Sequence, residues 1–332
     1  MEAQRYPDDY DGIVAGNPAH DWTRFYVGAH LWYAQATLAD PDSYIPPYKI
    51  GVLAEAVNAA CDHLDGIIDG ILADPRRCAF DPGQLTCGAE DDPATCLTIK
   101  QVAAVRAIWE GGRTPDGTPI YSGLLPGGEA DPGGWTRWVT GPEPFAGLHY
   151  RAADGFFKYM VFEDPEWDFR SFDYDADLAY ALRKVGPILD ARDPDLDAFR
   201  SREGKLIVYH GWSDADITAL SSIEYYEMVA SRLGGERGRA AGLSETAEFF
   251  RLFLVPGMGH CRGGPGPDRF DALGALESWV ELGTTPARII ASQIADGQIV
   301  RTRPLCPYPQ AGAWSGQGSP DSEANFACEV TD

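Results

Sequence analysis

The chain has 332 residues, of which 44% are hydrophobic and 11% aromatic, enough for one large domain or two ordinary ones. Its 27 Lys and Arg residues against 50 Asp and Glu residues give a formal net charge of -23. Such a charge repels phosphate backbones and anionic lipid surfaces, which argues against a nucleic acid partner. No stretch approaches the roughly 20 consecutive apolar residues of a membrane-spanning helix, so no membrane partner is expected either.

The first residues contain no basic segment followed by an apolar stretch, so no signal peptide is visible. Met1 leads directly into Glu-Ala-Gln-Arg-Tyr-Pro, which is typical of the end of a helix rather than of a natural beginning. We therefore expect the natural protein to extend upstream of Met1.

The segment from about residue 19 to 194 is rich in loops and contains four of the seven cysteines. It also holds six of the nine tryptophans, namely Trp22, Trp32, Trp109, Trp135, Trp138 and Trp167. A helix is predicted over residues 98–110, because Val102, Val105 and Ile108 fall on one face. We predict that residues 19–194 form an inserted domain.

The second half alternates between predicted strands and helices. Short apolar runs predict strands over residues 205–209, 249–255 and 287–295. Helices are predicted over 218–233, where Thr218 supplies the cap, and over 268–283, beginning at Asp268. This alternation indicates an α/β sheet, in which functional residues gather in the loops after the carboxyl ends of the strands.

The cysteines fall into three neighbouring pairs with one left over. Pairing Cys61 with Cys78, Cys87 with Cys96, and Cys306 with Cys328 closes short loops, as in proteins folded under oxidising conditions. A zinc site is the alternative, but the sequence has no C-x-x-C motif. The odd residue, Cys261, is either a free thiol or has its partner outside this chain.

Two of the predicted loops carry an acid and a base. Acyl transfer by a serine hydrolase requires a nucleophile, a histidine that takes its proton, and a carboxylate that orients the histidine. In α/β-hydrolases these residues follow the order Ser, Asp, His. Asp214 and His260 occupy the last two places of that order. His210 is a rival base, but it ends a buried strand, so we expect structural hydrogen bonds there.

The nucleophile itself is not apparent. It is expected in a G-x-S-x-G motif, where glycines permit a tight turn between strand and helix, and the sequence contains none. Ser213 has a glycine two residues before it but not two residues after it, and it adjoins the proposed acid. We therefore reject Ser213 as the nucleophile.

Four separated segments resemble the tannase and feruloyl esterase family, which also includes hydrolases of terephthalate monoesters. The resemblance covers nearly the whole chain. The matching segments are MEAQRYPDDYDGIVAG at 1–16, YHGWSD at 209–214, PGMGHC at 256–261, and RPLCPYP at 303–309 with NFAC at 325–328.

The resemblance implies where the missing nucleophile would lie. In the family, a Cys-Ser pair in a G-C-S-x-G-G turn precedes the segment that matches Met1. The cysteine of that pair forms a disulfide with the cysteine beside the catalytic histidine, which here is Cys261. By this resemblance the chain lacks the serine, and one explanation covers both the absent nucleophile and the odd cysteine.

The same resemblance identifies residues 62–71 as a calcium loop in a lid domain. The implied ligands are Asp62, Asp65, the Ile67 carbonyl, Asp69 and the Ile71 carbonyl, an oxygen set of the kind that Ca²⁺ prefers. Without the family, the spacing favours an acidic turn, because it is not that of an EF-hand.

The sequence thus predicts an N-terminally truncated α/β-hydrolase core with a large inserted lid. Residues 1–18 and 195–332 would form the core, and residues 19–194 the lid with its calcium site. The expected function is hydrolysis of small-molecule esters of aromatic acids, by a secreted or periplasmic protein whose present chain is inactive alone. The alternative is a non-catalytic module that binds aromatic compounds or calcium. No oligomeric state is predicted.

Overall fold

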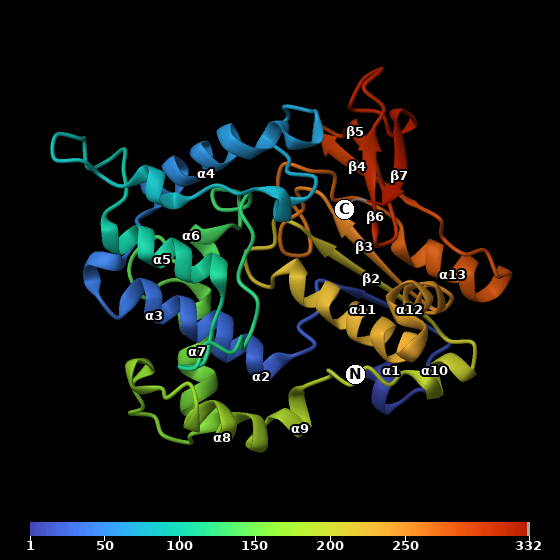
Figure 1. Ribbon diagram of the computed structural model, residues 1–332, viewed down its shortest axis with the longest axis horizontal. Coiled ribbons are helices and arrows are strands. Elements are labelled where there is room, and N and C mark those ends of the chain that lie inside the picture. The colour runs from blue at the N-terminus through green and yellow to red at the C-terminus, as the bar shows by residue number, and fades with distance from the viewer. Residues whose placement is uncertain (331–332) are drawn as a thin grey trace.

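The computed structural model describes residues 1–330 (Figure 1). The strands are β1 (Gly12–Gly16), β2 (Lys205–Gly211), β3 (Phe250–Val255), β4 (Ile289–Ala295), β5 (Gln298–Leu305), β6 (Gln310–Trp314) and β7 (Phe326–Val330). The helices are α1 (Glu2–Arg5), α2 (Trp22–Phe25), α3 (Trp32–Leu38), α4 (Pro47–Cys61), α5 (Ile99–Glu110), α6 (Trp135–Trp138), α7 (Leu148–Phe156), α8 (Ala176–Lys184), α9 (Gly186–Leu189), α10 (Asp197–Ser201), α11 (Ala219–Gly234), α12 (Gly238–Thr246) and α13 (Ala272–Leu282).

A parallel sheet with the order β1-β2-β3 organises the molecule. Gly16 pairs with Tyr209 in β2, and His210 pairs with Leu254 in β3. Because all three strands run in the same direction, their carboxyl ends lie at one edge, as the sequence predicted for an α/β sheet. The parallel sheet with helices around it is consistent with an α/β-hydrolase fold.

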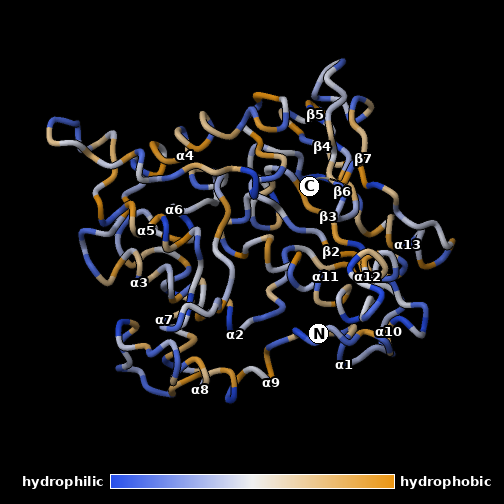
Figure 2. The backbone as a smooth tube through the Cα atoms, in the orientation of Figure 1, coloured by the Kyte–Doolittle hydropathy of each residue, from blue (hydrophilic) through white to orange (hydrophobic). Residues whose placement is uncertain are grey.

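Both faces of β2 and β3 are buried, whereas the residues of β1 are half-buried. Leu206 and Val208 pack with Ile223 and Val229 of α11. Ile207, which points to the opposite face, packs with residues of α13 and β4. In Figure 2 the hydrophobic colour is strong along β3 inside the molecule, whereas the outer loop before α5 is coloured hydrophilic. Burial on both faces explains why β2 and β3 are nearly continuous apolar runs.

The predicted helices are present, with one boundary misplaced. Thr98 caps α5 through a reciprocal capping box, and Thr218 caps α11. Helix α13 was predicted to begin at Asp268, but its cap is Asp271, whose side chain accepts a hydrogen bond from the Gly274 amide. Asp268 instead binds the Gly263 amide, so it belongs to the preceding loop.

The predicted strand at 287–295 exists as β4, but it does not join the parallel sheet. It forms an antiparallel hairpin with β5. Asp296 and Gly297 both have positive φ, 51° and 76°, which is the geometry of a two-residue turn that folds the chain back on itself. The strands β6 and β7 form a second antiparallel pair.

The segment between the adjacent strands β1 and β2 is helical, and α2–α9 gather on one side of the molecule (Figure 1). Its two hydrophobic clusters centre on residues such as Tyr33 and Phe157. The first cluster also includes Ala215 and Ile217, which follow β2. The helical segment therefore packs directly against the loop that carries Asp214. None of the helices in residues 1–330 has the length and apolarity that a bilayer span requires.

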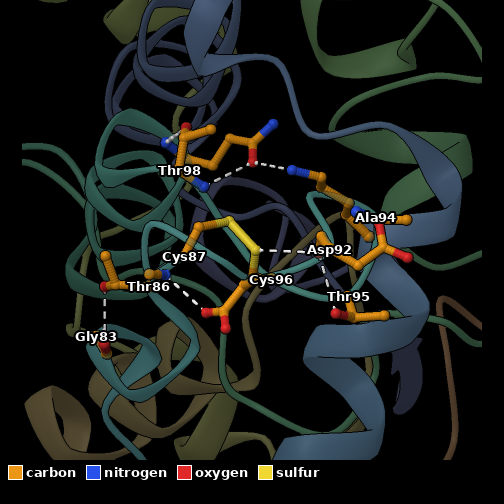
Figure 3. Close-up of a disulfide and its surroundings, with 12 residues drawn as sticks. Gly83, Thr86, Cys87, Asp92, Ala94, Thr95, Cys96 and Thr98 are labelled. Atoms are coloured by element: carbon orange, nitrogen blue, oxygen red, sulfur yellow. Dashed lines mark hydrogen bonds between the residues drawn. A yellow bond between two sulfur atoms is a disulfide. The ribbon is translucent and has the colours of Figure 1, made fainter.

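The three expected disulfides are present and join Cys61 to Cys78, Cys87 to Cys96, and Cys306 to Cys328. Figure 3 shows the Cys87–Cys96 bond, where the Cys87 amide also donates to the Leu97 carbonyl at 2.9 Å. Among the described residues, Cys261 alone is a free cysteine, and it is exposed.

Candidate active site

Three loops meet where the carboxyl ends of the parallel strands lie together. Asn17 directly follows β1, Asp214 lies three residues after β2, and His260 lies five residues after β3. The Oδ2 atom of Asp214 is 2.5 Å from the Asn17 Nδ2 and 3.0 Å from the His260 Nδ1. Asp214 and His260, predicted from the sequence as acid and base, are thus in hydrogen-bond contact.

The loop that carries His260 is fastened to the end of β2. The Ser213 amide donates to the Met258 carbonyl at 3.0 Å, and the Trp212 amide donates to the Val255 carbonyl at 3.0 Å. Gly211 permits this approach, because a Cβ atom there would lie 2.1 Å from the Met258 oxygen. Met258 is itself fully buried, which anchors the loop in the core.

Asp214 is a buried carboxylate whose two oxygens are both bound. Its Oδ1 accepts from the amides of Asp216 and Ile217 at 2.8 and 3.0 Å, while Oδ2 accepts from Asn17 and His260. Burial alone would raise the pKa of Asp214, but hydrogen bonds from His210 and His260 outweigh it and hold the pKa below its ordinary value. Asp214 is therefore ionised at neutral pH.

His260 is partly exposed and lies between two carboxylates. Its Nδ1 contacts Asp214, and its Nε2 is 3.7 Å from the Asp216 Oδ2. Burial would lower the pKa of His260, but the hydrogen bonds to Asp214 and Cys261 and the charges of the two carboxylates raise it to about 10. The ring of Trp138 packs edge-on against the imidazole, with centroids 5.0 Å apart.

An open cleft of about 770 Å³ lies in front of His260. Aromatic side chains from α2, the turn that follows it and α6 form much of its wall, with Arg151 of α7 also at its edge. The aromatic residues are Trp22, Phe25, Tyr26 and Trp138. Two of the six tryptophans of the 19–194 segment therefore reach the cleft, while Trp135 is buried in the core.

His210, the rival base, is fully buried and makes the structural hydrogen bonds that were expected. Its Nδ1 contacts the Ser222 hydroxyl at 2.8 Å, and its Nε2 contacts the Ile217 carbonyl at 2.9 Å. Ser213 donates to the Gly127 carbonyl rather than to a histidine. His210 Nε2 also lies 3.4 Å from the Asp214 Oδ2, but His210 is fully buried and does not line the cleft, and Ser213 has no histidine partner.

Sequence reasoning missed two polar residues beside the pair. Asn17 adopts φ 45°, which asparagine tolerates better than most residues, and its side chain binds Asp214. Asp216 lines the cleft and contacts His30 and His149 from the helical segment. The D-A-D spacing at 214–216 was a signal for Asp216, but its histidine partners lie far away in the sequence.

The proposed calcium loop is folded around its own carboxylates. Asp65 Oδ1 accepts from the Ile67 amide at 2.9 Å, and Asp69 Oδ1 accepts from the Ile71 amide at 3.2 Å. Four of the five proposed ligands, all except Asp62, line one small cavity. Burial, together with the neighbouring Asp69 and Asp62, raises the pKa of Asp65 to about 6. Crowded carboxylates of this kind fit a hard cation.

The fit is incomplete in three respects. Asp62 accepts a hydrogen bond from the Gly70 amide through both of its oxygens. The three carboxylates also lack the close spacing of the His30, His149 and Asp216 cluster, whose ligand atoms lie within 4.8 Å of one another. That cluster is the one such group among the described residues. Asp69 Oδ2 is also 3.0 Å from the Arg303 guanidinium, which already supplies positive charge. Calcium at this loop therefore stays a proposal.

The comparisons with known proteins agree with this architecture. The model of the family described as tannase and feruloyl esterase matches residues 1–329. The chain is 39% identical to an uncharacterized esterase of Xanthomonas campestris, covering 99% of this chain and 62% of that protein. It is 36% identical to the mono(2-hydroxyethyl) terephthalate hydrolase of Piscinibacter sakaiensis, covering 99% and 61%.

A solved structure gives the same result at the level of the fold. The crystal structure of an esterase from Aspergillus oryzae superposes with a TM-score of 0.88 at 30% identity, covering 99% of this chain and 66% of that one. The chain thus spans about three fifths of the length of the curated relatives it matches. On the family match over nearly its whole length, the chain belongs to the tannase and feruloyl esterase family.

Proposed function

We propose that the chain is the acid- and base-bearing part of a carboxylic ester hydrolase that cleaves esters of aromatic acids through an acyl-serine intermediate. His260 takes the proton of the serine as it attacks the ester carbonyl, and then gives that proton to the departing alcohol. Asp214 holds the imidazole through Nδ1 and stabilises its charged form.

One observation carries this proposal: His260 Nδ1 and Asp214 Oδ2 are 3.0 Å apart at the carboxyl edge of a parallel sheet, with the imidazole facing a cleft. This contact leaves Nε2 as the atom that exchanges a proton with the substrate side. The Asn17 amide and two backbone amides saturate the remaining positions on Asp214, so its carboxylate cannot turn away from the histidine.

The aromatic wall of the cleft supports the choice of substrate class. Trp22 and Tyr26 stack on each other with centroids 5.0 Å apart, and both line the cleft. Flat rings of this kind favour a flat acyl group through stacking and burial of apolar area. The family name, tannase and feruloyl esterase, and the name of the terephthalate hydrolase both refer to esters of aromatic acids.

The serine is proposed to come from outside these 332 residues. The sequence contains no G-x-S-x-G motif. Within residues 1–330, the side chains in hydrogen-bond or ion-pair contact with His260 are those of Asp214, Asp216 and Cys261, and none of them carries a hydroxyl. Cys261, free and adjacent to the base, is proposed to pair with the cysteine beside that serine.

A second candidate function is a non-catalytic module that binds aromatic compounds. The specific observation in its favour is the aromatic wall of the cleft, which is complete within these residues. The raised pKa of His260 also leaves less free base at neutral pH. The two candidates differ in one measurable respect: a catalytic His260 gives hydrolysis that rises with pH, whereas a binding module gives none at any pH.

The test compares two polypeptides on methyl ferulate and a p-nitrophenyl ester. Residues 1–332 alone are expected to hydrolyse them no faster than the same chain with Asp214→Ala. A longer polypeptide carrying a G-C-S-x-G-G segment before Met1 is expected to be active, and to lose about 10⁴-fold in kcat on Asp214→Ala.

Three outcomes contradict the proposal. Activity of the longer polypeptide that survives both Asp214→Ala and His260→Gln removes the acid and base assignment. Activity of residues 1–332 alone that is lost on Asp214→Ala places a nucleophile inside this chain. Failure of the longer, folded polypeptide to hydrolyse any ester favours the binding module.

The remaining assignments follow from the same proposal. The 19–194 segment acts as a lid over the cleft, with structural Ca²⁺ bound at residues 62–71. Three disulfides fit an oxidising compartment, so the protein is proposed to be secreted or periplasmic.

A further inference from the structure

A buried cluster of polar side chains beside His260 has no part in the triad. Asp216 Oδ1 is 3.0 Å from the His30 Nε2 and 3.1 Å from the His149 Nε2. The two imidazole rings stack with centroids 4.3 Å apart, and all three residues are buried. His30 lies in the π-helix Tyr26–Leu31 between α2 and α3, and His149 lies at the start of α7.

The spacing of these atoms is compatible with a metal site, but the histidine nitrogens argue against one. Within the described residues, the Nδ1 atoms of His30 and His149 are buried and have no hydrogen-bond partner. If Nε2 bound a cation, each Nδ1 would carry a proton and become a buried donor without an acceptor, which is costly. If Nε2 carries the proton, it donates to Asp216, and only a lone pair at Nδ1 is left unpartnered.

The cluster is therefore best described as two imidazoles that each donate from Nε2 to one carboxylate. Burial, followed by the neighbouring His149, lowers the pKa of His30 to about 4, so this ring is neutral above that pH. Burial would raise the pKa of Asp216, but the donors His149 and His30 hold it well below its ordinary value. Asp216 therefore keeps its negative charge although it is buried, because the two histidines replace water as its hydrogen-bond donors.

The second oxygen of this carboxylate faces the catalytic base. Asp216 Oδ2 is 3.7 Å from the His260 Nε2, the nitrogen opposite the one that Asp214 holds. Other charged or titratable side chains near His260 lie on its own loop or on the helical segment. These groups are Cys261, Arg262, Asp268 and Arg269 of the loop, with Arg137, Arg151 and His30 of the segment.

We propose that Asp216, held as an anion by His30 and His149, is a positioning residue that stabilises the imidazolium form of His260 from its Nε2 side. Asp214 and Asp216 then flank the ring, one on each nitrogen. When Nε2 takes the proton of a nucleophile, the charge that forms lies beside Asp216. The arrangement sets the pH at which His260 becomes a free base, and it rests on the proposed function only for its effect on hydrolysis.

The first experiment measures the titration of His260 in residues 1–332 and needs no activity. Proton–carbon NMR spectra of the imidazole rings follow each histidine with pH, and His260→Gln identifies the signal. Asp216→Asn is expected to lower the pKa of His260 by about one unit or more, since one of two adjacent anions is lost. Asp154→Asn is the charge-matched control, because Asp154 lies on α7 with His149 and its carboxylate pairs with Lys158. This control is expected to leave the pKa of His260 unchanged.

His149→Phe separates the effect of the histidine donors from that of the Asp216 carboxylate. It removes one donor to Asp216 at similar size, and it is expected to lower the pKa of His260 in the wild-type background but not in the Asp216→Asn background. Such non-additivity means that His149 acts through Asp216. If Asp216→Asn does not fold, Asp216→Leu replaces it, with thermal unfolding as the check.

Two results overturn the proposal. An unchanged His260 titration in a folded Asp216 variant shows that the second carboxylate has no influence on the base. Stoichiometric Co²⁺ binding, detected by its visible absorption and lost in Asp216→Asn, shows that the cluster is a metal site instead. In an active longer polypeptide, Asp216→Asn is expected to shift the acid limb of the kcat/KM profile to lower pH; absence of all hydrolysis contradicts the proposed function and leaves the NMR result standing.

Discussion

The environment of Asp214 shows how single residues build this site from distant parts of the chain. Asn17 and Asp214 are separated by 197 positions, yet their side chains are 2.5 Å apart in a buried place. A buried carboxylate is stable only when its oxygens are bound by donors, and the Asn17 and His260 donors come from segments that the sheet has aligned. Asn17 is thus as firmly part of the site as the two residues that the sequence identifies.

Substitution of Asn17 tests this contact, with glycine and alanine as a matched pair. Asn17→Gly tolerates the positive φ and removes only the side-chain amide, so the free energy of unfolding is expected to fall by about 1.5–3 kcal/mol, the range for a bond to a charged group. Asn17→Ala is expected to cost roughly 1 kcal/mol more, because its Cβ strains the left-handed backbone. Urea unfolding measures both, and a Gly variant as stable as wild type contradicts the role of the amide.

Because His260 is protonated in the folded state, the free energy of unfolding is expected to fall at alkaline pH. Its folded pKa, about 10, lies above the value of about 6.5 expected in the unfolded chain. The folded state therefore binds more protons between these values, and the stabilisation is fully present below about pH 6.5 and is lost as pH rises through about 10.

Urea unfolding at a series of pH values measures this contribution as the difference between wild type and His260→Gln. The difference is expected to shrink with rising pH, by up to about 1.4 kcal/mol per pH unit. His63→Gln, at an exposed histidine, is the matched control. A difference that stays constant over this pH range shows that His260 does not hold its proton in the folded state.

At the scale of elements, the 62–71 loop and the β4–β5 hairpin are joined by charge. Arg303 and Arg301 of β5 lie 3.0 and 3.3 Å from the Asp69 Oδ2. The Arg303 guanidinium is buried and also lies over the Phe326 ring. The loop is therefore held against the C-terminal part of the fold, and a cation at the loop would stabilise both elements.

Calcium binding at this loop is tested by thermal unfolding. At a Ca²⁺ concentration about 100-fold above Kd, binding adds about 2.7 kcal/mol, which is about 4 °C in Tm for a chain of this length. Asp65→Asn is expected to abolish the increase, because it removes a charged ligand. Asp92→Asn, at an exposed turn with the same kind of side-chain bond to a backbone amide, is expected to retain it. An equal Tm in Ca²⁺ and in chelator argues against the site.

At the scale of the whole molecule, adjacent strands come from distant parts of the sequence. β1 and β2 pair directly although the 19–194 segment lies between them. That segment packs on the loop after β2, and it supplies Trp138, His30 and His149 to the surroundings of His260. The surroundings of His260 thus depend on both the sheet and the helical segment.

The thiol content of the folded chain is a property of this whole arrangement. Reaction with a thiol reagent under non-denaturing conditions is expected to modify one cysteine, and Cys261→Ser is expected to remove that reaction. All six other cysteines are bonded within the chain. A verified monomer with no reactive thiol, or with more than one, contradicts the pairing.

The sequence by itself determined the features that depend on local pattern. Apolar runs located β2 and β3, capping residues located the starts of α5 and α11, and neighbouring cysteines gave the three disulfides. Asp214 and His260, which the sequence places in loops after parallel strands, lie in hydrogen-bond contact. These signals succeed because the physical cause, whether burial, capping or loop closure, lies within a few residues of the effect.

Only the tertiary structure decided the features that depend on contacts between distant segments. The hairpin partner of β4, the loop position of Asp268 and the amide of Asn17 on Asp214 are of this kind. So is the Asp216 cluster, where His30 lies 186 positions away. Buried polar groups need hydrogen-bond partners, but no local sequence pattern predicts which distant side chain provides them. The sequence therefore gives the proposed acid and base, and the fold gives the groups that surround them.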